Sequence, residues 1–140
     1  MIKQLLIFTF VMLSFLGRSH EKGGAILGVW LTQKRDAKIE IYAKSKLYYG
    51  RVVWLAEPHD KNGKSVVDEK NPDPILRKRT IFGLDILIGL RSDNNGAFEG
   101  SIYDPREGTT YECKLWLSGE TLKVRGYSGW LYDTRTWTRV

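Results

Sequence analysis

The feature that most constrains the fold of this chain is the alternation of apolar and polar side chains in most of the sequence after residue 25. In residues 38–43 and 110–117 the apolar side chains fall on every second position, the period of a strand with one buried face. Similar runs, rich in Val, Ile, Tyr, Trp and Thr, are found at about 28–33, 46–56, 84–91, 97–103, 120–126 and 134–139. No segment shows a competing helical period. We therefore expect eight strands and an all-β fold.

The breaks between most of these runs are short and have the composition of turns. Residues 34–36, 92–96, 104–108 and 118–120 are rich in Gly, Asn, Asp, Ser and Pro, and each joins neighbouring runs by a few residues. Such links join antiparallel strands. We predict an eight-stranded antiparallel up-and-down barrel in preference to a sandwich, because closure removes the exposed sheet edges. The interior of such a barrel is either filled by side chains or open to one small ligand.

One connection is much longer than the others. Residues 58–79 are polar and contain three of the four prolines. Loops of this length are often lids or mobile segments. Asp73 and Pro74 form a good N-cap and first-turn pair, so we expect a short helical lid over residues 74–79 at one mouth of the barrel. The alternative is a solvated loop without a role.

The first nineteen residues have the pattern of a secretory signal peptide. Lys3 precedes an apolar run from Leu5 to Leu16, which is too short to span a membrane, and Gly17 and Ser19 offer small side chains at the two positions that a signal peptidase inspects. We expect residues 20–140 to form a single soluble domain that is periplasmic or secreted, with no integral membrane association. The single cysteine, Cys113, can form no internal disulfide and is too far along the chain to be a lipid anchor.

Charge argues against nucleic-acid binding. The formal net charge is +6, and without Lys3 and Arg18 it falls to +4, with no block of five basic residues. A mild positive charge suits solubility or the attraction of anionic ligands. The oligomeric state is left open.

Few residues of the chain have a pattern that indicates catalysis. His20 lies at the expected mature N-terminus and His59 lies in the long loop, while no serine has the Gly-x-Ser-x-Gly setting of a nucleophile elbow. Histidine, cysteine and carboxylates show no metal-ligand spacing, so we predict neither a metal nor a cofactor. Cys113 alternates with Tyr111 and Leu115 and is expected inside the barrel as an inert thiol. We expect that the protein is not an enzyme.

Aromatic and arginine residues are the stronger candidates for a site. Aromatic side chains lie within or at the ends of the expected strands, among them Trp137, and rings of this kind often line small-ligand pockets. For any single ring, packing in the core is the better explanation. Arg51 shares a strand face with Tyr49 and Val53 and is the best interior arginine for an anionic head group. The candidate ligand-binding residues are Tyr49, Arg51, Trp54, Tyr103, Tyr111, Cys113 and Tyr127.

Two pieces of the chain resemble the lipocalin pattern. Gly28-Val29-Trp30 matches its Gly-x-Trp at the first strand, and Arg139 matches the arginine that stacks on that tryptophan and closes one end of the barrel. Further motifs are Asn71-Pro72-Asp73, Ile102-Tyr103-Asp104-Pro105, Gly108-x-x-Tyr111-x-Cys113, Leu122-x-Val124-Arg125-Gly126-Tyr127 and Thr136-Trp137-Thr138-Arg139. Together they resemble the bacterial family catalogued as domain of unknown function twenty-one forty-seven, from about Gly28 to Val140.

The resemblance implies an exported lipocalin-like barrel with Gly28, Trp30 and Arg139 as closing residues, and it implies no reaction. The chain departs from the family at Gly108-Thr109-Thr110-Tyr111 and at Tyr132-Asp133-Thr134-Arg135, where the family has Gly-Lys-Thr-Tyr and Gly-Arg-Thr. Our leading hypothesis is a binder of a small apolar or amphipathic, and possibly anionic, molecule in the barrel interior. The alternative is a solid barrel that acts through its outer surface as an envelope or host-facing interaction module.

Overall fold

A computed structural model describes residues 24–140 of the chain. The expected signal peptide, residues 1–19, and His20 lie outside the described residues. No helix among the described residues is long and apolar enough to cross a membrane.

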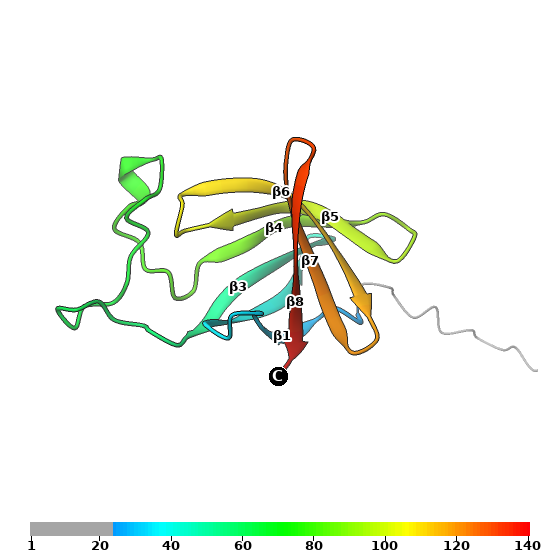
Figure 1. Cartoon of the computed structure of the whole chain (residues 1–140), viewed down its shortest axis with the longest axis horizontal. Helices are drawn as coiled ribbons and strands as arrows, with labels where there is room; N and C mark the ends of the chain where they lie inside the picture. Colours follow the sequence, from blue (N-terminus) through cyan, green and yellow to red (C-terminus); the bar gives the residue numbers. More distant parts are fainter. Residues whose placement is uncertain (1–23) are drawn as a thin grey trace, which may run out of the picture.

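Eight antiparallel strands form one closed barrel (Figure 1). In chain order they are β1 (Gly28–Leu31), β2 (Ala37–Lys44), β3 (Leu47–Leu55), β4 (Asp85–Ser92), β5 (Ala97–Asp104), β6 (Thr109–Ser118), β7 (Thr121–Ser128) and β8 (Leu131–Arg139). Each strand pairs with the next, and β8 returns to β1 through Trp30–Arg139 and Leu31–Thr138. The predicted all-β, up-and-down barrel is therefore confirmed.

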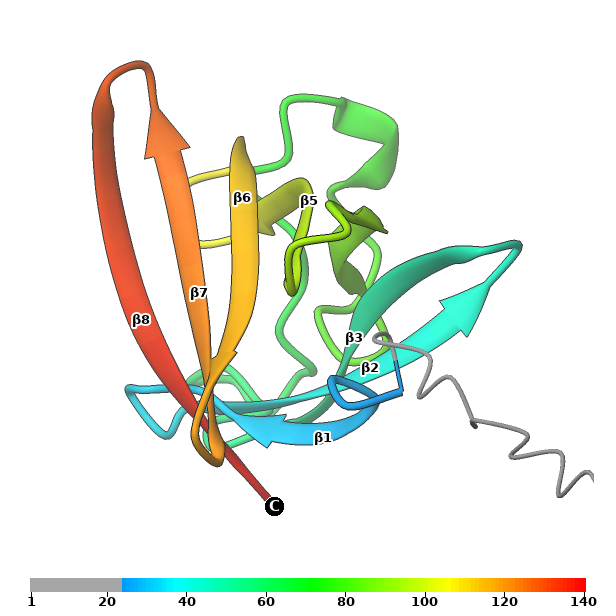
Figure 2. The ribbon, with the colours of Figure 1, turned by 90° about the vertical axis from the view of Figure 1, so that its right-hand side faces the viewer.

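The β7–β8 hairpin is longer than its alternation predicted. Ser128 pairs with Leu131, so only Gly129 and Trp130 form the loop. Gly129 has a φ of 61°, which glycine adopts without the steric cost that a side chain imposes. As a result β8 begins at Leu131, three residues before the expected start, and the hairpin projects beyond the neighbouring strands (Figures 1 and 2).

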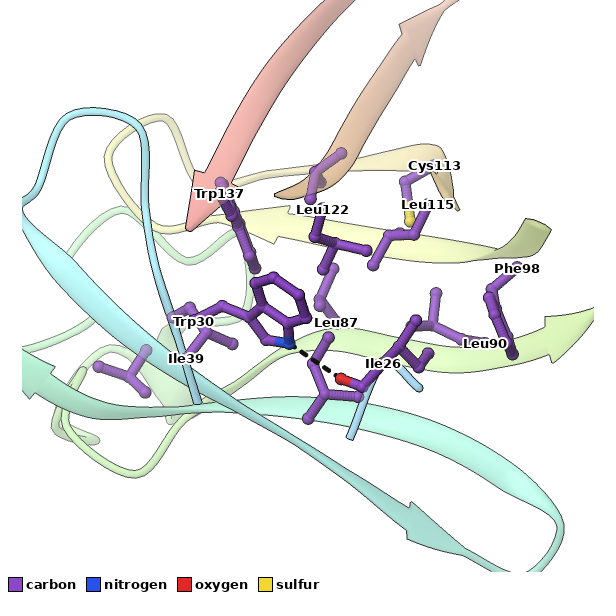
Figure 3. Close-up of a cluster of buried hydrophobic side chains, with 13 residues drawn as sticks. Ile26, Trp30, Ile39, Leu87, Leu90, Phe98, Cys113, Leu115, Leu122 and Trp137 are labelled. Atoms are coloured by element: carbon purple, nitrogen blue, oxygen red, sulfur yellow. Dashed lines mark hydrogen bonds between the residues drawn. The ribbon is translucent and has the colours of Figure 1, made fainter. Parts of the chain in front are cut away.

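Buried apolar side chains fill one end of the barrel (Figure 3). Trp30 is fully buried at its centre, and its indole Nε1 donates a hydrogen bond to the carbonyl of Ile26 at 2.9 Å. Around it pack Ile39, Leu87, Leu90, Phe98, Leu115, Leu122 and Trp137. This packed end acts as the floor of the barrel.

The long connection between β3 and β4 contains no helical lid. Its only helical element is a single 3-10 turn, η1 (Pro74–Leu76), which Asp73 caps by accepting a hydrogen bond from the Ile75 amide at 3.0 Å. The predicted cap and proline are present, but the turn ends after three residues because it has no buried face to extend along the barrel. The expected helix over residues 74–79 is thus wrong in length and in role.

Candidate functional site

Above the packed floor the barrel interior opens into a cavity of about 1360 Å³. The cavity lies between β2, β3 and the long loop on one side and β5 to β8 on the other. Its deeper wall is apolar, and it comprises Ile39, Val52, Leu55, Ile81, Ile86, Ile102, Val124 and Trp137. Ligand pockets commonly have volumes of about 300–1000 Å³, so there is room for one small molecule.

The rim of the cavity is polar, and two of its arginines are paired with carboxylates. Arg135 faces inward like Trp137, two residues along β8, and its Nε donates to Asp133 Oδ2 at 2.6 Å. Arg106 lies between Asp104, at 3.3 Å, and Asp36, at 3.9 Å. The rim therefore presents two guanidinium groups that carboxylates hold in place, beside an apolar interior.

The residues expected to close the barrel lie together at the packed end. The Arg139 guanidinium carbon is 4.1 Å from the centre of the Trp30 ring, and its two Nη atoms donate to the carbonyls of Leu27, at 2.8 Å, and Ala25, at 2.6 Å. Gly28 has a φ of 117°, and a Cβ there would lie 3.0 Å from Arg139 Nη1. Glycine thus allows the arginine to cover the tryptophan, which seals this end of the barrel.

Two of the seven candidate ligand-binding residues point into the barrel from β6. Tyr111 lines the cavity, and its hydroxyl donates to Glu107 at the rim. Cys113 lies deeper, in the packed core rather than in the open cavity. Burial raises the pKa of the Cys113 thiol to about 12, so it stays protonated at neutral pH.

Arg51 and Tyr49 lie on the outer face of β3, contrary to the expected interior position. The inward position between them is Gly50, where a Cβ would be only 2.7 Å from Leu87 Cδ1, so the tight packing against β4 fixes this side as the inside. Arg51 remains charged outside, where its Nε donates to Glu40 at 2.8 Å and its guanidinium covers the Tyr42 ring. Tyr49 stacks on Tyr42.

Trp54 also lies outside, although simple alternation puts it on the face opposite Arg51. The register of β2 and β3 shifts between Lys38 and Ile39, so that Lys38 pairs with Trp54 and Ile39 pairs with Val52. The extra residue of this bulge shifts the inward and outward positions of β3 by one residue, so the side chains after it change face. The Lys38 ammonium accordingly lies 4.9 Å from the Trp54 ring centre on the outer surface.

Tyr103 and Tyr127 also occupy outward positions, and both take part in the edges of the cavity. Tyr103 is covered by the long loop, where its hydroxyl donates to Asp68 Oδ1 at 2.5 Å and accepts from Asn71 Nδ2 at 3.3 Å. It also borders a smaller outer groove of about 600 Å³, with Tyr49, Phe82 and Ile88. Tyr127 packs on Tyr132, with ring centres 6.2 Å apart.

Several lining residues were missed by the sequence analysis. Arg135 lies two residues from Trp137 in the sequence, and this spacing is the signal that both share the inner face of β8. Ile81 comes from the end of the long loop and packs on the core, and no periodicity indicates that position. Within the described residues no group of three His, Cys, Asp or Glu side chains is arranged to hold a metal ion.

Comparisons with known proteins agree with this architecture. A family model described as "Uncharacterized protein conserved in bacteria (DUF2147)" matches residues 28–139. No curated protein matches the chain. Among solved structures, the chain is similar to protein HP1028 from the human pathogen Helicobacter pylori, described as belonging to the lipocalin family. The two share 23% sequence identity with a TM-score of 0.70, over 81% of this chain and 82% of that one, a likeness of fold.

Proposed function

We propose that this chain, which belongs to the bacterial family DUF2147 and has a lipocalin-like barrel, binds one small apolar or amphipathic molecule in the barrel interior. The observation that carries the proposal is the cavity of about 1360 Å³ above a packed floor. A barrel that used its core only for stability would fill this space with side chains, since protein interiors are close-packed.

The chemistry of the cavity favours a ligand with an apolar body and a polar head. Aliphatic side chains and Trp137 form the inner wall, and they would be desolvated by an acyl chain or ring system. Arg135 takes the place of Arg51 as the interior-facing arginine. A ligand carboxylate that displaced Asp133 from Arg135 would gain a charge-assisted hydrogen bond at the rim.

The proposal includes export and a role without catalysis. Residues 1–19 support export to the periplasm or beyond, where amphipathic molecules need a carrier. The thiol of Cys113 is protonated and enclosed in the core, which supports a binding role over a nucleophilic one.

A fluorescent fatty-acid titration tests this function. Ile102→Trp places a large side chain on the cavity wall, so we expect it to weaken probe binding by at least about tenfold, because it occupies the space that the ligand needs. Tyr49→Ala removes an aromatic ring from the outer face and serves as the matched control, with unchanged affinity expected.

The same titration tests whether Arg135 binds the carboxylate of the ligand. A fatty acid is expected to bind more tightly than the alcohol of equal chain length, and Arg135→Gln is expected to remove the difference. Absence of saturable probe binding by the unaltered protein, or equal losses in Ile102→Trp and Tyr49→Ala, contradicts binding inside the barrel.

A second candidate function, an interaction module of the envelope, draws support from the outer surface. Large apolar side chains are exposed at Ile75, Phe82, Trp130, Leu131 and Tyr132. Trp130, Leu131 and Tyr132 are consecutive in the chain, and a contiguous exposed apolar patch is typical of contact surfaces. Pull-down from the bacterial envelope compares the unaltered protein with variants that lack these side chains. A partner lost from the variants supports this role over ligand carriage.

A further inference from the structure

The tip of the β7–β8 hairpin is the most exposed apolar feature among the described residues. Trp130 is 88% exposed, and Leu131 and Tyr132 beside it are 57% and 61% exposed. The ladder of the hairpin runs up to the pair Ser128–Leu131, so only Gly129 and Trp130 lie beyond it. A tip with so few backbone groups outside a ladder has a low cost of entering the interface of a bilayer.

A second projection lies on the same side of the molecule. The η1 turn and the hairpin tip both stand at the upper side of Figures 1 and 2, which share a vertical axis. Ile75 in η1 is 87% exposed. Two apolar tips on one side of the barrel match a flat, extended surface better than a small partner protein.

Basic residues lie near both projections. Residues 70–80 contain four Lys and Arg and one Asp, with Arg79 paired with Asp68, and residues 125–135 contain two Arg and one Asp. Lys70, Arg77 and Lys78 are near η1 in the sequence. In the hairpin, the Arg125 guanidinium lies 4.2 Å from the Tyr132 ring centre, and Arg135 holds Asp133.

We propose that the hairpin tip and η1 together form a docking face for an anionic lipid bilayer. Trp and Tyr prefer the interface between hydrocarbon and water, and basic residues just behind such a tip bind anionic head groups. Leu131 and Tyr132 also line the rim of the cavity, so docking places that rim against the bilayer. The docking face is independent of a cavity ligand, but delivery of an amphipathic molecule from bilayer to barrel rests on the proposed function.

Co-sedimentation of the purified protein with phosphatidylcholine vesicles, with and without phosphatidylglycerol, tests the docking face. Binding is expected only when phosphatidylglycerol is present. Trp130→Ala is expected to weaken it by at least about tenfold through loss of interfacial burial, and Lys78→Ala by about fivefold through loss of one cation. Phe82→Ala removes another exposed aromatic side chain, in the outer groove, and is expected to leave binding unchanged.

Three results would overturn the docking face. The first is no binding to either vesicle, and the second is equal binding by Trp130→Ala and Phe82→Ala proteins that have the circular dichroism of the unaltered chain. The third is self-association that Trp130→Ala abolishes without any vesicle binding, which assigns the tip to a second copy instead. Ile102→Trp separates the two proposals, because it blocks the cavity and is expected to retain vesicle binding.

Discussion

Asp68 is the residue that fastens the long loop to the barrel wall. Its side chain is fully buried, and it accepts hydrogen bonds from Tyr103, Asn71 Nδ2 at 2.9 Å and Arg79 Nε at 3.0 Å. Burial tends to raise the pKa of Asp68, but these three donors outweigh it and hold the pKa below its ordinary value. The same contact raises the pKa of Tyr103, through burial first and then through the Asp68 hydrogen bond.

Asp68→Asn is expected to lower the free energy of unfolding by about 2 kcal/mol at neutral pH, since it removes charge-assisted hydrogen bonds at a buried position. A carboxyl with a lowered pKa stabilises the folded state above its unfolded pKa of about 3.9, and that stability is lost as the pH falls through its folded value. The difference between the unaltered protein and the variant is therefore expected to shrink in acid. Urea unfolding at neutral and acidic pH measures it, and a difference independent of pH contradicts this role of the Asp68 carboxylate.

Residue-level reasoning from the sequence succeeds where one strand face is unambiguous. The alternation of Tyr111, Cys113 and Leu115 predicts the inward face of β6, and the structure has the same alternation. It fails on β3, because Tyr49 and Arg51 alternate with Tyr48, Gly50 and Val52, and both sets contain apolar or aromatic side chains. The deciding contact, Gly50 against Leu87, lies between strands more than thirty positions apart in the sequence.

Among the elements, the turn between β5 and β6 supports the long loop. Gly108 has a φ of 68°, and a Cβ there would lie 1.9 Å from the carbonyl oxygen of Lys70. The turn and the loop are therefore packed so closely that only glycine permits the contact. This contact and the Asp68 cluster hold the loop against the barrel in place of the expected helical lid.

Gly108→Ala is expected to cost about 3 kcal/mol of folding free energy, from positive-φ strain and the clash with Lys70 together. Gly63 has a similar φ of 75°, and no atom lies within 4 Å of the position that a Cβ would occupy there. Gly63→Ala therefore isolates the strain alone, about 1 kcal/mol. Chemical denaturation of both variants gives the two values. Equal losses would show that the loop is not packed on this turn.

Element boundaries were predictable wherever turn chemistry was explicit. Short polar links fix most hairpins, and Asp73-Pro74 starts a helical turn where expected. The length of that turn was not predictable, because it depends on burial against the barrel and no side chain in η1 is buried. The bulge that turns Trp54 outward likewise depends on pairing with β2.

For the whole molecule, the closed barrel follows from eight short-linked strands, but the state of its interior does not. An eight-stranded barrel accommodates either a filled core or one ligand. Here large side chains around Trp30 fill one end, and the other end, where Gly126 and Ile102 face inward, is left open. The side chains that reach the barrel axis are determined by the register of all eight strands together. No local sequence pattern predicts that register.

Methyl NMR during a titration with decanoic acid is the sharpest test of an open, ligand-binding barrel interior. Shifts are expected at the cavity methyl groups of Leu55, Ile81, Ile86, Ile102 and Val124, with little change at the outward-facing Ile75 and Ile88. Saturable shifts confined to the cavity set are expected if decanoic acid enters the barrel. No shifts at any concentration, or shifts confined to Ile75 and Ile88, would contradict an open interior.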